Sequence, residues 1–146
     1  MLLSDAPFDP WAWLGQFEKT LPPGKAGACA AFVGSLRDFN DGEEVQEMFL
    51  EHYPGMTERE LEKLLTEARR RWPLLDARIV HRVGRVQPGE TLVLAAAWST
   101  HRGPACDACR FLIEELKRRA PLWKRESLSG ASQRWVSGNS DGYAAV

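Results

Sequence analysis

Two lysines near the carboxyl end of the sequence are spaced as a reactive pair. Lys117 and Lys124 lie in ELKRRAPLWKRE (residues 115–126), which holds five cations and one proline. Pro121 bends the chain between them, so both amines can return to one spot. Two ammonium groups that are close together and partly buried disfavour each other's charge, which yields a nucleophilic or proton-transferring amine. The alternative is a solvated helix end whose cations offset the helix dipole.

Three further cations are candidates for binding an anion. His101 and Arg102 lie between a predicted strand and a predicted helix, where outward N–H groups and a guanidinium can form a phosphate site. Arg37 follows an apolar strand at the predicted rim of a sheet, although such a residue is more often a surface charge. A second pair, His81-Arg82, lies inside a predicted strand and points to opposite faces, so we predict a structural role with one side chain packed and one solvated.

A CxxC motif offers a different chemistry. Cys106 and Cys109 lie near a predicted helix start, where the helix dipole stabilises a thiolate, so a redox pair is one interpretation. Against it, Cys106 lies a turn inside the helix and its neighbours are not those of thioredoxin-like motifs. A zinc site needs a second ligand pair, which Cys29 alone does not supply. The preferred interpretation is small buried hydrophobic residues, and we expect neither a metal nor a cofactor.

The composition limits the classes of partner. The chain has 146 residues, a formal net charge of −1 and a pI near 6.3, which gives no general attraction to nucleic acid or an anionic membrane. The sequence has neither a signal peptide nor an apolar run of about 20 residues. An odd number of cysteines suits a reducing compartment, so we expect a cytoplasmic protein. No Walker loop, GxGxxG or Ser-His-Asp order is present.

The elements that must position these side chains follow the order α-β-β-α-β-β-α-β. We predict one α+β domain over residues 1–146, with an antiparallel sheet, flanking helices, a core of about 26–126 and a flexible tail at 138–146. The predicted helices are a short one from Pro10, one over 57–72 and one from about 103 to 120. The predicted strands are 27–36 paired as a hairpin with 44–53, then 77–86 paired with 91–99 through QPGE, and finally 133–137.

The second helix has the clearest pattern. Thr57 and Glu60 match a capping box, in which each side chain accepts from the other residue's backbone N–H. Apolar residues then recur at the helical spacing until Pro73. These residues are Leu61, Leu64, Leu65, Ala68 and Trp72. The pattern predicts an amphipathic helix packed on a sheet.

Five stretches, in this order and at these intervals, resemble the large, catalytic subunit of molybdopterin synthase. They are GACAAFVGSLRDFN, LEHYPGMTERELEKL, RWPLLDARIVHRVGRVQPGE, STHRGPA and LKRRAPLWKRE. The likeness runs from about residue 26 to 126. It implies an α/β-hammerhead fold, a homodimer within a heterotetramer, and a small ubiquitin-like partner with a carboxyl-terminal Gly-Gly thiocarboxylate.

The implied activity is sulfur transfer in molybdenum-cofactor biosynthesis, which converts cyclic pyranopterin monophosphate to molybdopterin. The resemblance implies Lys117 and Lys124 as catalytic residues, and Arg37, His101 and Arg102 as substrate-binding residues. Some of the substrate-binding residues are expected to reach across the dimer interface. The Cys106/Cys109 pair departs from the pattern of the family.

Two alternatives stay open at this point. One is a noncatalytic module that docks an acidic or Gly-Gly protein tail, which predicts binding without product. The other is a thiol oxidoreductase built on Cys106 and Cys109, which predicts a lowered thiol pKa and indifference to loss of the lysines.

Overall fold

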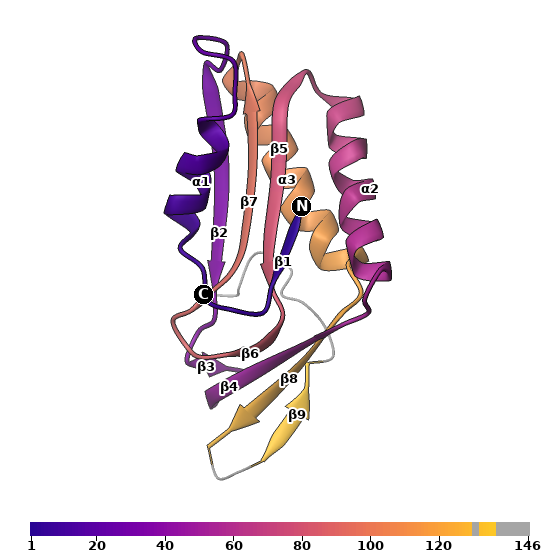
Figure 1. The fold of residues 1–146 in the computed structure, drawn as a ribbon. Coiled ribbons are helices and arrows are strands. Elements are labelled where there is room, and N and C mark those ends of the chain that lie inside the picture. Colours follow the sequence, from indigo (N-terminus) through magenta and orange to yellow (C-terminus); the bar gives the residue numbers. More distant parts are fainter. Residues whose placement is uncertain (130–131, 137–146) are drawn as a thin grey trace.

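The computed structural model describes residues 1–129 and 132–136, and these form two sheets and three helices (Figure 1). The larger sheet has the strand order β1-β5-β7-β2, comprising β1 (Leu2–Ser4), β5 (Leu74–Arg82), β7 (Thr91–Ser99) and β2 (Ala28–Ser35). Strands β5, β7 and β2 are antiparallel, whereas β1 pairs with β5 in parallel. The α+β class predicted from the sequence is confirmed.

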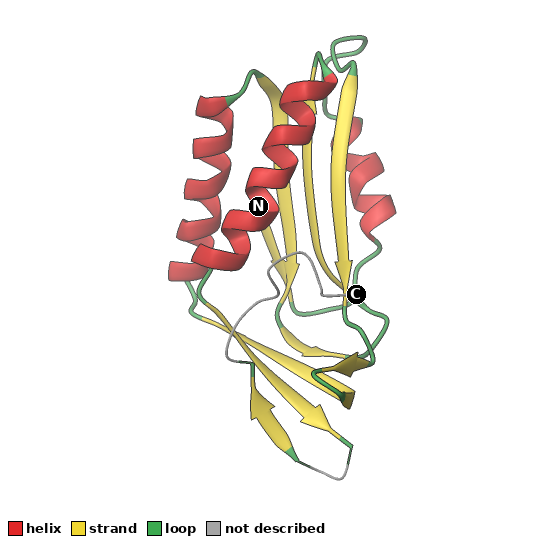
Figure 2. Ribbon diagram, turned by 180° about the vertical axis from the view of Figure 1, so that it is seen from behind, coloured by secondary structure: helices red, strands yellow, loops and turns green. Residues whose placement is uncertain are grey.

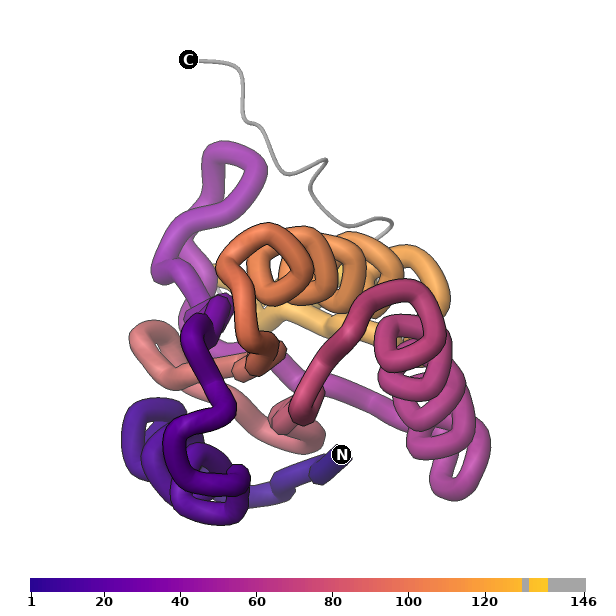
Figure 3. The backbone as a smooth tube through the Cα atoms, turned by 90° about the horizontal axis from the view of Figure 1, so that it is seen from above, coloured from indigo at the N-terminus to yellow at the C-terminus, as the bar shows by residue number. Residues whose placement is uncertain are grey.

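Helices cover both faces of the larger sheet (Figure 3). Helices α2 (Met56–Arg71) and α3 (Arg102–Arg119) pack on one face, and the short α1 (Pro10–Glu18) lies on the other. As predicted, Asp9 caps α1 by accepting from the N–H groups of Trp11 and Ala12. The predicted apolar stripe of α2 meets α3 and the sheet in one core. Its fully buried members include Leu61, Leu64, Leu65, Ala68, Ala77, Ile79, Ala95 and Leu112.

A second sheet lies across one end of the first (Figures 1 and 2). It has the order β3-β4-β8-β9, with β6 also paired to β4. Its strands are β3 (Phe39–Asn40), β4 (Glu43–His52), β8 (Leu122–Leu128), β9 (Gln133–Trp135) and β6 (Gly84–Val86). A small core of Leu36, Met48, Leu50 and Val86 joins it to the turns of the larger sheet. The carboxyl end of α3 also lies at this end of the molecule.

The predicted hairpin between residues 27–36 and 44–53 is wrong. Strand β2 pairs with β7, and the hairpin forms one step later, between β3 and β4. Asp41 and Gly42 both have positive φ, 49° and 80°, which is the conformation of a two-residue turn that closes directly on its flanking strands. The turn therefore selects the short strand at Phe39–Asn40 as the partner of β4 and leaves β2 free for the larger sheet.

The pairing of residues 77–86 with 91–99 is confirmed in part. Strands β5 and β7 pair from Leu74 to His81, and the QPGE turn closes with Glu90 N–H donating to Gln87 at 3.1 Å. The chain bends at Gly84, whose φ is +81°, so the last three residues become β6 and join the second sheet. Strands β1, β3 and β8 were not predicted. Ser137, the last residue of the predicted strand 133–137, lies outside the described residues, as does the predicted tail 138–146.

The capping box of α2 is not the one predicted. The helix begins at Met56, and Glu58 accepts from the N–H of Gly55, while Glu60 pairs with Lys63 instead. Thr57 is fully buried. Its hydroxyl accepts from Tyr53 N–H at 3.0 Å and donates to the carbonyl of Pro121 at 3.1 Å. The threonine thus links the start of α2 to the segment that connects the two predicted catalytic lysines.

Candidate active site

The two lysines lie on either side of a sharp change of structure. Lys117 lies in the last turn of α3, which ends at Arg119. Pro121 then turns the chain, with its carbonyl held by Thr57, and β8 begins at Leu122 and carries Lys124. The proline bend predicted from the sequence is present, and Lys124 returns on a strand of the second sheet that was not predicted.

The alternation of β8 places Lys124 on the inner face of the second sheet. Lys124 is half-buried and lies opposite Leu50 of β4, which is 1% exposed. The residues two and four positions further along, Glu126 and Leu128, are buried on the same face, whereas Trp123 is exposed. The Lys124 side chain therefore points away from solvent, toward the region between the second sheet and the end of α3.

The positive charge of Lys117 reaches Lys124. The pKa of Lys124 is lowered from 10.5 to about 8, first by burial and second by the positive charge of Lys117. The carboxylate of Glu126 acts in the opposite direction. A lysine in this state exchanges its proton near neutral pH, which is the property that a general acid–base residue needs.

His81 is a third member of this cluster that the sequence did not identify. Its side chain is 4% exposed at the end of β5, and Nδ1 lies 2.7 Å from the carbonyl oxygen of Arg82. Burial, with smaller contributions from the charges of Lys124 and Lys117, lowers the pKa of His81 from 6.5 to about 4, although the hydrogen bond to Arg82 acts in the opposite direction. The imidazole is therefore neutral at physiological pH and lies within electrostatic reach of both lysines.

The prediction that one residue of the His81-Arg82 pair is solvated is wrong. Arg82 is 2% exposed, and its guanidinium donates to the carbonyls of Ser4, Val83 and Arg85. Backbone carbonyls from β1, from the bend before β6 and from β6 itself replace water around the cation, which makes burial possible. Arg82 has the structural role that was predicted for the pair, whereas His81 lies within electrostatic reach of the lysines.

Arg37 lies at the same end of the larger sheet. It follows β2, is exposed, and borders an open depression of about 520 Å³. The depression is lined by Leu36, Arg37, Asp38, Phe39, Pro88 and Gly89. The position agrees with the predicted location at a sheet rim. A cation here is accessible to an anionic ligand.

His101 and Arg102 lie at the opposite end of α3 from Lys117. His101 is the N-cap residue and Arg102 the first residue of the helix, and both are exposed. Fifteen residues separate Arg102 from Lys117, which corresponds to roughly 22 Å at 1.5 Å per residue. One copy of the chain therefore does not bring this pair to its own lysines.

A buried ion pair supports the strand that carries Lys124. Glu126 is 1% exposed and accepts from Arg134 at 3.0 Å and from the Asn40 amide at 2.8 Å. Arg134 also pairs with Glu43 at 2.8 Å. This network joins β3, β4, β8 and β9.

The period-2 alternation of LWKRESL is the signal that could have revealed β8, but charges on both faces obscured it.

The cysteines do not form an activated thiol pair. Cys109 is buried, as predicted, whereas Cys106 is exposed because it faces away from the sheet on α3. Burial raises the pKa of Cys109 to about 11. A raised pKa disfavours the thiolate and therefore opposes redox chemistry.

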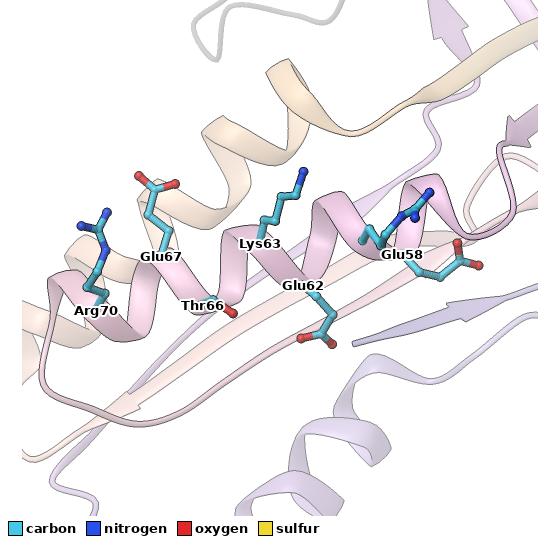
Figure 4. A pocket seen from close by; sticks show the side chains of 7 residues that line it. Glu58, Glu62, Lys63, Thr66, Glu67 and Arg70 are labelled. Carbon is cyan, nitrogen blue, oxygen red and sulfur yellow. The ribbon is translucent and has the colours of Figure 1, made fainter.

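The depression beside α2 does not carry the chemistry of a competing site. A depression of about 490 Å³ runs along α2 (Figure 4), but its side chains are charges of both signs with the spacing of a solvated helix face, and Lys63 pairs with Glu60. Across residues 1–129 and 132–136, no three His, Cys, Asp or Glu side chains gather as metal ligands. Within those ranges, no helix has the length and apolar character needed to cross a bilayer.

The structure defines an α+β protein in which Lys117, at the end of α3, lowers the pKa of Lys124 on β8 of the second sheet. The family model described as MoaE protein matches residues 3–119. The chain is 54% identical over 120 residues to the molybdopterin synthase catalytic subunit of Pseudomonas aeruginosa, covering 82% of this chain and 79% of that one. It therefore belongs to the MoaE family.

Solved structures agree with this assignment. The molybdopterin biosynthesis MoaE protein of Burkholderia ambifaria is 42% identical, with a TM-score of 0.79 over 96% of this chain and 90% of that one. The molybdopterin synthase of Staphylococcus aureus is 28% identical, with a TM-score of 0.82 over 92% of this chain and 95% of that one. The hammerhead-like α+β fold class implied by the sequence resemblance is confirmed.

Proposed function

We propose that this chain is the catalytic subunit of a molybdopterin synthase, a sulfurtransferase that converts cyclic pyranopterin monophosphate to molybdopterin. Membership of the MoaE family and the names of the relatives support the activity. The observation that carries the mechanism is the pairing of Lys117 with a half-buried Lys124 whose pKa is about 8.

Each lysine has a distinct role in this proposal. The thiocarboxylate tail of a small partner enters the space between α3 and the second sheet, and Lys117 lies beside its carbonyl. Once the thiocarboxylate sulfur has bonded to the pterin substrate, water adds to the carbonyl carbon. The ammonium stabilises the negative charge that develops on the carbonyl oxygen in this addition, before the carbon–sulfur bond breaks and leaves a carboxylate on the partner tail. Lys124, with its pKa near neutrality, exchanges the proton that accompanies the transfer.

The remaining cations hold the substrate. Arg37, His101 and Arg102 bind the phosphate or the pterin through charge-assisted hydrogen bonds. His101 and Arg102 lie roughly 22 Å along α3 from Lys117, so this role requires a second copy of the chain to supply them. The geometry therefore supports a homodimer in which each site takes residues from both copies.

The proposed partner is a small ubiquitin-like subunit that ends in a Gly-Gly thiocarboxylate, bound once per copy to give a heterotetramer. The relatives' name, catalytic subunit, supports a further subunit. We propose a cytoplasmic location, which the three free cysteines support.

Lysine substitution tests the function directly. Lys117→Ala and Lys124→Ala should each lower the rate of dithiolene formation by about 100-fold or more, the range for loss of an acid–base group. The assay is mass spectrometry of the pterin product after mixing with a thiocarboxylated partner. Lys63→Ala is the matched control, because Lys63 is an exposed lysine of α2. Normal turnover in both test variants, with folding verified by circular dichroism, rejects the mechanism.

The same assay separates the alternatives. A noncatalytic docking module binds the partner tail but yields no product. A thiol oxidoreductase loses its activity in a Cys106→Ser/Cys109→Ser double variant and is indifferent to the lysines. We expect the double variant to be fully active, because the raised pKa of Cys109 keeps its thiol protonated.

A further inference from the structure

We propose that His81 is a positioning residue for the lysine pair, and that its Nε2 atom accepts a hydrogen bond from a lysine amine and so fixes that amine for reaction. This inference rests on the proposed function, because it assigns His81 to the same reaction. His81 is not one of the cations that the sequence marked as part of the site.

The fold places His81 where α3, β5 and the second sheet meet. It lies on the strand opposite Val93, two residues after Ile79, so it shares the face of the sheet that α2 and α3 cover. Three residues later Gly84 pairs with Leu50 of β4, and Lys124 pairs with the same Leu50 from the other side. The end of β5 is thus held close to the strand that carries Lys124.

The hydrogen bond to Arg82 determines which ring nitrogen can act. The carbonyl of Arg82 can only accept, so Nδ1, at 2.7 Å, carries the proton. Burial keeps the ring neutral at physiological pH, because the pKa is about 4. Nε2 is then the ring nitrogen with a lone pair, and it can only accept. The donors whose charges reach the ring are the amines of Lys117, from α3, and Lys124, from β8.

A neutral acceptor at His81 can bind one of two ammonium groups that repel each other. Two ammonium groups repel each other, and the carboxylate that attracts Lys124, that of Glu126, already accepts from Arg134 and Asn40. A carboxylate at position 81 would neutralise the pair, and a charged imidazole would add a third repelling cation. A neutral imidazole accepts from an amine without removing the charge repulsion that lowers the pKa of Lys124.

The competing explanation is that His81 only holds the end of β5 through its bond to Arg82. Two amide substitutions distinguish the explanations, since the asparagine side chain can place an N–H near the position of Nδ1, and the longer glutamine can place an oxygen acceptor near that of Nε2. His81→Gln keeps the contact to the lysines, whereas His81→Asn keeps the contact to Arg82. The two explanations therefore predict opposite orders of activity.

The experiment measures turnover and lysine titration in both variants with the full chain. Turnover is followed as dithiolene formed with the thiocarboxylated partner, and the pKa of each lysine by pH-dependent acetylation and mass spectrometry. The control is Val80→Ala, because Val80 is fully buried on the opposite face of β5. It reports the effect of lost packing alone.

We expect His81→Asn to lower kcat by about 30-fold and His81→Gln by less than about fivefold. The midpoint of the affected lysine should fall by at least about 0.5 pH unit in His81→Asn, because the ammonium loses its acceptor, and stay within about 0.2 in His81→Gln and in Val80→Ala. Equal rates in all variants, or a faster Asn than Gln variant, overturn the proposal.

The design separates this inference from the proposed function. If the wild-type chain forms no dithiolene, the proposed function fails, while the lysine midpoints still test the hydrogen bond. If the wild type is active and the midpoints do not move, only the role of His81 fails. If His81→Asn does not fold, the His81→Gln variant alone tests the proposal. A tenfold loss of kcat or a shift in the titration midpoint of the lysine in His81→Gln refutes the proposal. Retention of both the wild-type kcat and the wild-type midpoint supports it.

Discussion

Replacing Lys117 by methionine tests the electrostatic coupling of the lysine pair. Methionine keeps the apolar stem near the end of α3 and removes the charge. Two unit charges about 8 Å apart in a medium of effective dielectric constant about 40 repel each other by about 1 kcal/mol. The loss of this repulsion should raise the pKa of Lys124 from about 8 to about 9. Burial, the larger cause, remains, so the pKa stays below 10.5.

The higher pKa lowers the fraction of Lys124 that is neutral at pH 7. At pH 7 an amine of pKa about 8 is neutral in roughly a tenth of the molecules, and at pKa about 9 in roughly a hundredth. Chemistry that needs the neutral Lys124 therefore slows by about tenfold in Lys117→Met, beyond the loss of Lys117 itself.

Competitive acetylation across pH 6–11, read by mass spectrometry, gives the titration midpoint of Lys124. Lys63→Met is the control, because Lys63 lies exposed on α2 and pairs with Glu60. The control should leave the midpoint of Lys124 unchanged. A midpoint that is unchanged or lower in Lys117→Met refutes the coupling, and with it the convergence of the two amines.

Three further predictions concern the supports of the site. Glu126→Gln removes the carboxylate that raises the pKa of Lys124, so the same acetylation assay should give a midpoint below the wild-type value. Thr57→Val breaks the hydrogen bonds to Tyr53 and Pro121 and should lower the free energy of unfolding in urea by about 1–3 kcal/mol; an unchanged value contradicts the proposed link. His81 has a lowered pKa of about 4, so the unfolded state binds its proton first as pH falls from 6.5. The wild type should lose roughly 3 kcal/mol of stability between pH 6.5 and 4 that His81→Gln does not lose, as measured by urea unfolding at several pH values.

Local sequence signals predicted the elements whose determinants are close in the chain. Asp9 caps α1, the apolar spacing of α2 marks its buried face, and Pro121 ends α3. The Pro88-Gly89 turn was equally clear, because φ is fixed at proline and glycine tolerates the positive value of 90°. Each of these features depends on residues within a few positions of one another.

Strand partners were not predictable in the same way. β2 and β4 were predicted as hairpin partners but belong to different sheets, because the turn at Asp41-Gly42 closes on Phe39–Asn40. Strand β8 was missed, since its inner face combines Lys124 and a buried Glu126 with apolar residues. A buried carboxylate at Glu126 can be predicted only when its partner Arg134 is known to lie beside it.

The sequence alone led to the prediction of which cations belong to the chemistry, because residue types and their spacing are local properties that the family resemblance preserves. Only the tertiary structure decided their arrangement. It joins Lys117 and Lys124 across the α3–β8 junction, adds the neutral His81 from β5, and separates His101 and Arg102 by the length of α3. The physical reason is that pKa values and charge pairing depend on burial and on distances between segments far apart in the chain, which no local pattern encodes.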